Sequence, residues 1–186
     1  MRPRHRVIRS TMFLLVLGLL SGCASTPKKA VENIPDWYLN PPSDPSYLFA
    51  AATATSKSMQ LAVDKAKTQA QTALAQQLET RLGNLTKRFQ EETGVGEDSE
   101  LLQQFTSATK VVTKQTLIGA RIDKKQLTPE KGIYRAYVLM SLPIGRANQL
   151  LMDKIKANQN LYTRFRATQA FEELNKELEE YERQQP

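Results

Sequence analysis

Histidine and cysteine are almost absent from this sequence, which contains one of each, His5 and Cys23, in 186 residues. A single cysteine excludes the small folds that are held together by intrachain disulfides. Long apolar runs are also missing, since residues 12–20 form the longest and span only nine positions. Nine helical residues rise about 14 Å, whereas the hydrocarbon core of a bilayer is about 30 Å thick. The length and composition therefore indicate one compact domain without a membrane-spanning helix.

The positive charge of the chain is concentrated at its beginning. The formal net charge is +7, and residues 1–22 contribute four arginines and no acidic residue. A basic stretch, a short apolar core and small residues in that order are typical of an export signal. Removing residues 1–22 lowers the net charge to +3 and also removes His5. We therefore expect a nearly neutral exported protein that does not bind nucleic acid.

The export signal ends in Leu20-Ser21-Gly22-Cys23, which resembles the bacterial lipobox. The resemblance implies cleavage between Gly22 and Cys23, a diacylglyceryl group on the Cys23 sulfur and an acyl group, such as palmitate, on the new amino terminus. Because each buried CH₂ contributes about 0.8 kcal/mol, several acyl chains would make a permanent anchor. In signals of this kind, Asp at the next position favours the inner membrane. Ala24 therefore implies anchoring in the outer membrane, facing the periplasm or the cell surface.

The residues left after cleavage exclude most catalytic arrangements. Without histidine or a free thiol, the chain has no Ser-His-Asp or Cys-His arrangement and lacks the usual zinc and copper ligands. Two Ser-x-x-Lys sequences, at residues 25–28 and 107–110, lack the companion motifs of penicillin-binding enzymes. Asp36 and Asp44 leave a carboxylate pair, and so a hydrolase, as the weakest alternative. We expect no enzymatic activity, no cofactor and no metal.

The first half of the mature chain predicts a tether, a proline-rich entry segment, a strand and a long helix. Residues 24–33 are small and polar, and three prolines keep residues 34–42 extended and non-helical. Trp37 in that segment is interpreted as a packing residue, with a ligand-stacking aromatic as the alternative. Residues 47–55 predict a buried strand. A helix capped by Ser56 or Ser58 and running to about residue 92 carries an alanine-rich apolar stripe.

The second half predicts a short helix, a hairpin and a long C-terminal helix. Residues 99–105 favour a short helix, and the β-branched residues of 110–123 favour a strand. A turn at residues 124–132 leads to the strand 133–142, in which apolar and mixed faces alternate. Apolar residues then recur at helical spacing from Pro143 to the C-terminus. Basic and acidic blocks on this last helix are interpreted as solvated faces, or as surfaces for head-to-tail pairing with another copy or an envelope partner.

Together these elements predict an α+β fold: a small three-stranded, mainly antiparallel sheet packed on a long alanine-rich helix, with a long C-terminal helix that partly projects. We divide the chain into a signal peptide (1–22), a lipidated cysteine and tether (23–34), an α/β domain (35–150) and a C-terminal helical extension (151–186). Twelve residues separate Cys23 from Pro35 and reach at most about 40 Å when extended. The domain is therefore expected to work close to the membrane.

The combination of a lipobox with certain later motifs resembles the LPP20 family of bacterial lipoproteins. The motifs are Pro-Asp-Trp at residues 35–37, Asn-Pro-Pro at 40–42 and Tyr-Arg-Ala-Tyr-Val-Leu at 134–139. The resemblance implies a small non-enzymatic α/β domain of the cell envelope that binds or scaffolds a partner. Two alternatives stay open, a structural assembly subunit of an envelope machine, such as a flagellar or motility accessory lipoprotein, and a regulator of peptidoglycan synthesis. An envelope partner or self-association is expected, but the residues do not identify it.

Overall fold

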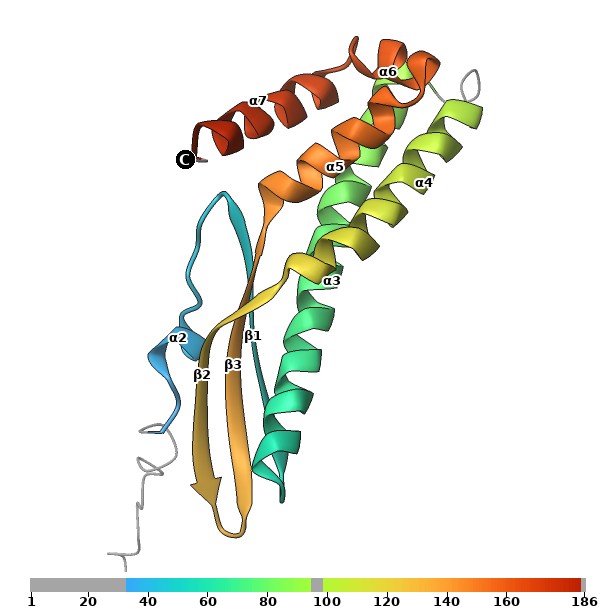
Figure 1. Cartoon of the computed structure of the whole chain (residues 1–186). Coiled ribbons are helices and arrows are strands. Elements are labelled where there is room, and N and C mark those ends of the chain that lie inside the picture. Colours follow the sequence, from blue (N-terminus) through green and yellow to red (C-terminus); the bar gives the residue numbers. More distant parts are fainter. Residues whose placement is uncertain (1–32, 95–98, 185–186) are drawn as a thin grey trace, which may run out of the picture. The chain divides into compact units, whose positions relative to one another are not determined.

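The computed structural model describes residues 33–94 and 99–184. The lipobox, with Gly22 and Cys23, and the Ser-x-x-Lys sequence at 25–28 lie outside the described residues. Residues 34–186 form one compact unit. Within it, three antiparallel strands lie in the order β1-β3-β2, and the longest helix, α3, covers one face of this sheet (Figure 1). The predicted α+β fold with a three-stranded antiparallel sheet on a long helix is confirmed.

The central strand, β3 (Ile133–Pro143), has two distinct faces. Alternate side chains, Ala136, Val138, Met140 and Leu142, join the hydrophobic core on the side of α3. The residues between them, Arg135, Tyr137, Leu139 and Ser141, lie on the opposite face because side chains alternate along a strand. β1 (Tyr47–Ser56) and β2 (Arg121–Glu130) pair with the two edges of β3. The strands predicted at 47–55 and 133–142 are confirmed.

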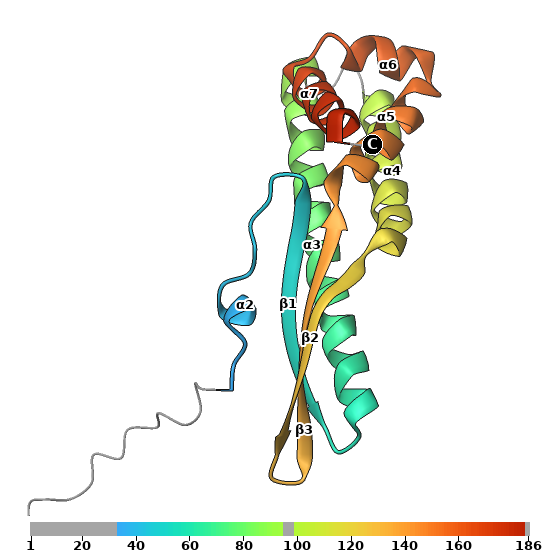
Figure 2. The same ribbon diagram turned by 60° about the vertical axis from the view of Figure 1, so that its left-hand side comes forward.

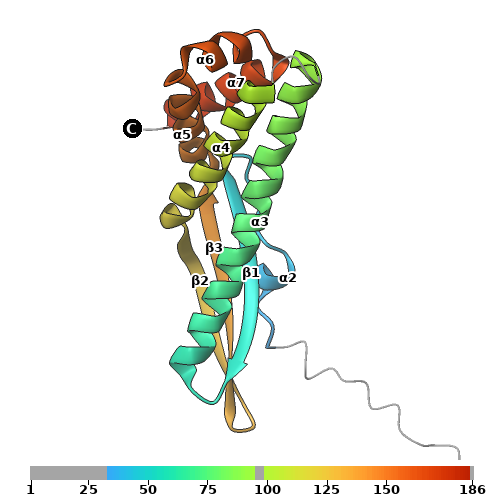
Figure 3. The ribbon, with the colours of Figure 1, turned by 90° about the vertical axis from the view of Figure 1, so that its right-hand side faces the viewer.

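The long helix α3 (Met59–Thr93) begins where the sequence predicts. The side chain of Ser58 accepts a hydrogen bond from the Leu61 N–H at 3.3 Å and so caps the helix. Ala62, Ala66 and Ala70 are fully buried. Because these side chains are small, the first half of α3 lies close against β1 and β3 (Figure 3). The second half continues beyond the sheet and packs on the other helices.

The strand predicted at residues 110–123 is wrong over most of its length. α4 (Ser99–Thr116) continues well past residue 105, and a 3₁₀ turn, η2 (Leu117–Gly119), precedes β2. The β-branched residues Val112 and Thr116 lie on the same buried helix face as Phe105 and Thr109. Spacings of three and four positions bury this face between α3 and α5, so packing overrides the strand preference of the individual residues.

The turn predicted at residues 124–132 is much shorter in the structure. β2 extends to Glu130, and only Lys131 and Gly132 connect it to β3. Both have positive φ, 38° and 87°, as a two-residue hairpin loop of type I′ requires. A bulge between Ile122 and Lys124 shifts the register of β2 near its start.

The C-terminal region is not one helix, and this prediction is also wrong. Three helices follow β3: α5 (Ile144–Lys156), α6 (Gln159–Phe165) and α7 (Gln169–Gln184). The Asn158 side chain caps α6 through the Leu161 N–H, and Thr168 accepts a hydrogen bond from the Phe171 N–H at the start of α7. α7 therefore turns back and packs on α5 and α3 instead of projecting (Figure 2).

The hydrophobic core continues from the sheet into the helices. Phe89 of α3, Phe105 of α4 and Phe165 of α6 are fully buried and pack with ring centroids 4.8 to 5.7 Å apart. This cluster joins the helices that follow the sheet-covering half of α3. It stabilises the fold of residues that were expected to extend away from the domain.

Candidate functional site

The entry segment of the compact unit lies across the sheet. We call residues 34–46 the strap; it contains the single-turn helix α2 (Asp36–Leu39), which follows Pro35. The sequence predicted an extended, non-helical segment here, and α2 corrects that prediction. Pro35 is the N-cap of this turn and has an extended backbone, and its carbonyl accepts a hydrogen bond from the Tyr38 N–H at 2.9 Å. The strap covers the face of the sheet that is opposite α3, and α2 contacts β3 and β1 (Figure 1).

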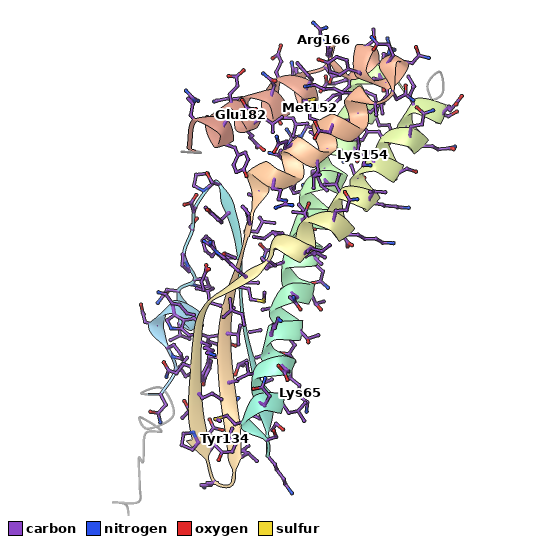
Figure 4. All side chains as sticks on the ribbon, in the orientation of Figure 1. Lys65, Tyr134, Met152, Lys154, Arg166 and Glu182 are labelled. Carbon is purple, nitrogen blue, oxygen red and sulfur yellow. The ribbon has the colours of Figure 1, made fainter. Side chains whose placement is uncertain are left out.

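The centre of the contact between strap and sheet is a pair of tyrosines. The rings of Tyr38 in α2 and Tyr137 in β3 meet edge to face, with centroids 5.1 Å apart and planes at 68°. Tyr137 is 6% exposed, and the neighbouring Leu139 is 1% exposed. Burial raises the pKa of the Tyr137 phenol, because the phenolate would lose its hydration. The strap therefore covers the part of the second face formed by β3 and β1, and side chains fill the space between strap and sheet (Figure 4).

Beside this pair, Arg135 holds Glu130 across the hairpin. The guanidinium donates two hydrogen bonds to the carboxylate, 2.6 Å from Nε to Oε1 and 3.1 Å from Nη2 to Oε2. These hydrogen bonds lower the pKa of Glu130 and raise the pKa of Arg135. The two hydrogen bonds to Glu130 fix the orientation of the Arg135 side chain on the strap side of β3. Tyr134, the residue before it in β3, is exposed near the hairpin end (Figure 4).

The predicted candidate residues of the strap serve its own turns. Asp36 Oδ1 accepts a hydrogen bond from the side chain of Asn40 at 3.1 Å, and Asp44 Oδ1 accepts one from the Ser46 N–H at 2.7 Å. Each aspartate thus closes a local turn, which accounts for both residues without a catalytic pair. Trp37 is partly buried within α2.

The Ser-x-x-Lys sequence at residues 107–110, which lacks the companion motifs of penicillin-binding enzymes, lies on α4. The side chains of Ser107 and Lys110 are exposed, one helical turn apart. The arrangement places neither residue in the strap or near the Tyr38–Tyr137 contact, which is formed by α2 and β3.

The end of the chain forms a second polar cluster that sequence reasoning missed. Arg81 Nη2 of α3 lies 2.5 Å from Glu177 Oε1 of α7, and Arg88 forms an ion pair with Glu173 one turn away. Asn148 of α5, which is 2% exposed, donates a hydrogen bond of 2.7 Å to Glu177 Oε2. These side chains line a pocket of about 310 Å³ between α3, α5 and α7. We call this cluster the α7 clamp.

The clamp changes the interpretation of the acidic block in the last helix. The sequence suggested solvated faces or head-to-tail pairing, but Glu173 and Glu177 bind arginines of the same chain. The signal that was available is the spacing of Arg81 and Arg88, seven residues apart on one face of α3. Glu179, Glu180 and Glu182 stay exposed, and Glu182 projects from the last turns of α7 (Figure 4).

Over residues 33–94 and 99–184, no cluster of three or more potential metal ligands occurs, and no helix has the length and hydrophobicity to cross a bilayer. Comparisons with protein-family models, with curated proteins and with solved structures found no match to this chain. The strap and the α7 clamp are therefore interpreted from their own geometry.

Proposed function

We propose that this chain is a non-enzymatic lipoprotein of the bacterial cell envelope. In this proposal Cys23 carries the lipid anchor in the outer membrane, and residues 34–186 present a binding or scaffold domain to the periplasm. The LPP20-like motifs at residues 35–37, 40–42 and 134–139 support the same assignment. The lipobox, Leu20-Ser21-Gly22-Cys23, is the observation that carries the proposal.

The strap supports an anchoring role for the N-terminal side of the domain. Its first residues follow the tether directly, and Pro35 is already buried. A force on the tether would reach the sheet through α2 and the Tyr38–Tyr137 contact. The strap is therefore suited to hold the domain at a short distance from a membrane, within the roughly 40 Å that twelve extended residues span.

Membrane fractionation tests the anchor. Cys23→Ala should abolish incorporation of an alkyne-labelled fatty acid and release the protein from outer-membrane fractions. Ser25→Ala, which changes a neighbouring residue outside the lipobox, is the matched control and should remain acylated. Ala24→Asp should move the acylated protein to the inner membrane of a diderm host. Outer-membrane fractionation of the Cys23→Ala protein would contradict the proposal.

The assembly-subunit alternative loses one of its supports. It depended on a charged C-terminal helix that projects from the domain, whereas α7 packs on α5 and α3 through the α7 clamp. Sedimentation of the full chain tests it separately from anchoring. A monomer that is unchanged when residues 167–186 are removed would exclude self-assembly through α7.

A further inference from the structure

A groove between α3 and α4 lies apart from the strap and shares only Leu82 with the pocket at the α7 clamp. Residues 79–86 of α3 and 106–114 of α4 form its walls, and its volume is about 500 Å³. The two helices run side by side along it (Figure 3). A volume of this size lies within the range of small-molecule sites, about 300 to 1,000 Å³. Neither the fold nor the proposed anchor requires an open groove here.

The groove is apolar although four threonines line it. Each hydroxyl donates a hydrogen bond to a carbonyl of its own helix: Thr86 to Leu82, Thr106 to Leu102, Thr109 to Thr106 and Thr113 to Thr109, at 2.8 to 3.1 Å. These donors are therefore satisfied within the helices, and the threonine methyl groups are left to face a ligand. With Leu82 they form a lining that favours hydrocarbon.

Gly83 leaves room in one wall of the groove. A glycine inside a helix costs about 1 kcal/mol relative to alanine. Gly83 lies within the 35 residues of α3, and a Cβ built on it would meet no atom within 4 Å. Packing inside the chain therefore does not require a glycine at this position. The space beside it is open to a molecule that enters the groove.

The rim of the groove on the α4 side carries positive charge. Lys110 and Lys114 lie one turn apart on α4, and no described carboxylate forms an ion pair with either lysine. Glu79 is the acidic residue of the groove, and it lies on the opposite wall, in α3. The α4 rim therefore attracts a single negative charge, while the floor between the helices takes an apolar group.

The dimensions favour a small amphiphile over a partner helix. The seven to eight residue steps along each wall correspond to about 12 Å. A partner helix lying along the groove would therefore contact it over little more than two turns of about 5.4 Å each, whereas a single alkyl chain would lie within it along its whole length. We propose that the groove binds a free single-chain alkyl carboxylate, with its tail against the threonine methyl groups and Gly83 and its carboxylate at Lys110 and Lys114.

Photo-crosslinking tests this site in the full chain. The protein, kept in an uncharged detergent, is exposed to dodecanoate with a diazirine at the end of its tail, and the labelled peptides are mapped by mass spectrometry. Labelling should concentrate in residues 79–86 and 106–114. Unlabelled dodecanoate should compete, whereas dodecyl trimethylammonium should not. Labelling spread evenly over the chain would overturn the proposal.

Two matched pairs of variants separate tail from headgroup recognition. Gly83→Leu should fill the groove and reduce labelling there about tenfold, whereas Ser107→Leu, on the exposed side of α4, should not. The double variant Lys110→Gln, Lys114→Gln should reduce labelling about fivefold. The control double variant Lys124→Gln, Lys125→Gln, in β2, should leave labelling unchanged. Equal labelling of the Gly83→Leu and Ser107→Leu proteins would contradict the site.

A third arm identifies the source of the alkyl chain. Vesicles of phosphatidylglycerol that carry the diazirine on an acyl chain replace the free carboxylate. We expect intact vesicles to label the groove only weakly. Free dodecanoate should compete with this residual labelling. Strong labelling from vesicles without such competition would show that the groove takes an acyl chain of a bilayer lipid, and would overturn the assignment to a free carboxylate. This experiment measures which residues are labelled, whereas anchoring at Cys23 is measured by acylation and fractionation. A negative result for the groove is therefore distinct from a negative result for the anchor.

Discussion

The ring of Tyr181 lies directly on Gly145, so that α7 contacts the first turn of α5 where α5 has no side chain. A Cβ built on Gly145 would fall within the space of the Tyr181 ring, and its nearest atoms are the Cγ, Cδ2 and Cβ of that residue. These atoms are close to the backbone of α7, so a rotation of the side chain alone would not clear the space. Gly145 therefore allows α7 to dock.

Gly145→Ala should displace α7. An alanine suits the interior of a helix, but here its methyl group would overlap the ring and force α7 outward, which we expect to cost about 1 to 3 kcal/mol of unfolding free energy. Urea unfolding measures the loss, and limited proteolysis between residues 166 and 184 measures the displacement. Gly119→Ala is the control, because a Cβ there meets no atom within 4 Å.

A second variant confirms the cause. In the Gly145→Ala protein, the additional change Tyr181→Ala removes the obstructing ring. The two changes should therefore cost less together than the sum of their separate effects, as expected for residues in contact. Additive effects would show that Gly145 acts through something other than Tyr181.

The α7 clamp predicts a small effect that depends on salt. Glu177→Gln removes the charge that Arg81 faces, and the two side chains are 36% and 41% exposed. An ion pair of this exposure contributes about 0.2 to 1 kcal/mol, and added salt weakens it. We expect a loss of stability within that range at low ionic strength and a smaller loss at about 1 M salt, measured by urea unfolding.

Glu180→Gln serves as the matched control for the clamp. Glu180 lies on the same helix and is exposed, and no described ion pair involves it. It should change stability little at either salt concentration. An effect of Glu177→Gln that does not respond to salt would assign the loss to the hydrogen bond from Asn148 instead of the charge on Arg81.

Local patterns in the sequence predicted the elements whose own residues carry a clear signal. Two candidate caps, Ser56 and Ser58, and the alanine stripe predicted α3, and the alternation along residues 133–142 predicted β3. The β-branched residues of α4 predicted a strand wrongly, since Val112 and Thr116 suit a strand as single residues but lie on a helix face here. Their burial against α3 and α5 depends on contacts that no local window contains.

The candidate sites are harder to predict, because they are formed by residues that lie far apart in the sequence. The periodicity of residues 169–184 indicates an amphipathic helix, but not which surface buries its apolar side. Asn158 and Thr168 make the turns that return α7 to α3, and both are ordinary capping residues that the sequence showed. Because apolar residues recur at helical spacing from Pro143 to the C-terminus, the sequence did not indicate that new helices begin at these two residues. Likewise, the Tyr38–Tyr137 contact joins residues 99 positions apart, and neither side chain indicates the other.

Removing the Tyr38 ring should uncover the second face of the sheet. Tyr38→Ala takes away the edge-to-face contact with Tyr137 and part of the cover of β3, which we expect to cost about 1 to 3 kcal/mol. Water would reach the Tyr137 phenol, and its raised pKa should move toward the ordinary value of tyrosine. Absorbance titration of the phenolate measures this shift. Tyr162→Ala, which changes a partly buried tyrosine on α6, is the control and should leave the titration of Tyr137 unaltered.

The buried phenol also predicts how stability depends on pH in the alkaline range. Because burial raises the pKa of Tyr137 in the folded chain, the folded state keeps this proton when the unfolded chain has begun to lose it, near pH 10. The contribution of Tyr137 is therefore fully present below about pH 10 and is lost as the pH rises through its folded pKa. Tyr137→Phe removes the titrating group, so its unfolding free energy should fall less steeply between about pH 9 and pH 11. Urea unfolding across this range measures the two slopes. Tyr134→Phe, at a residue that is 38% exposed, should retain the slope of the unmodified protein, and an equal flattening in both variants would show that burial under the strap is not the cause.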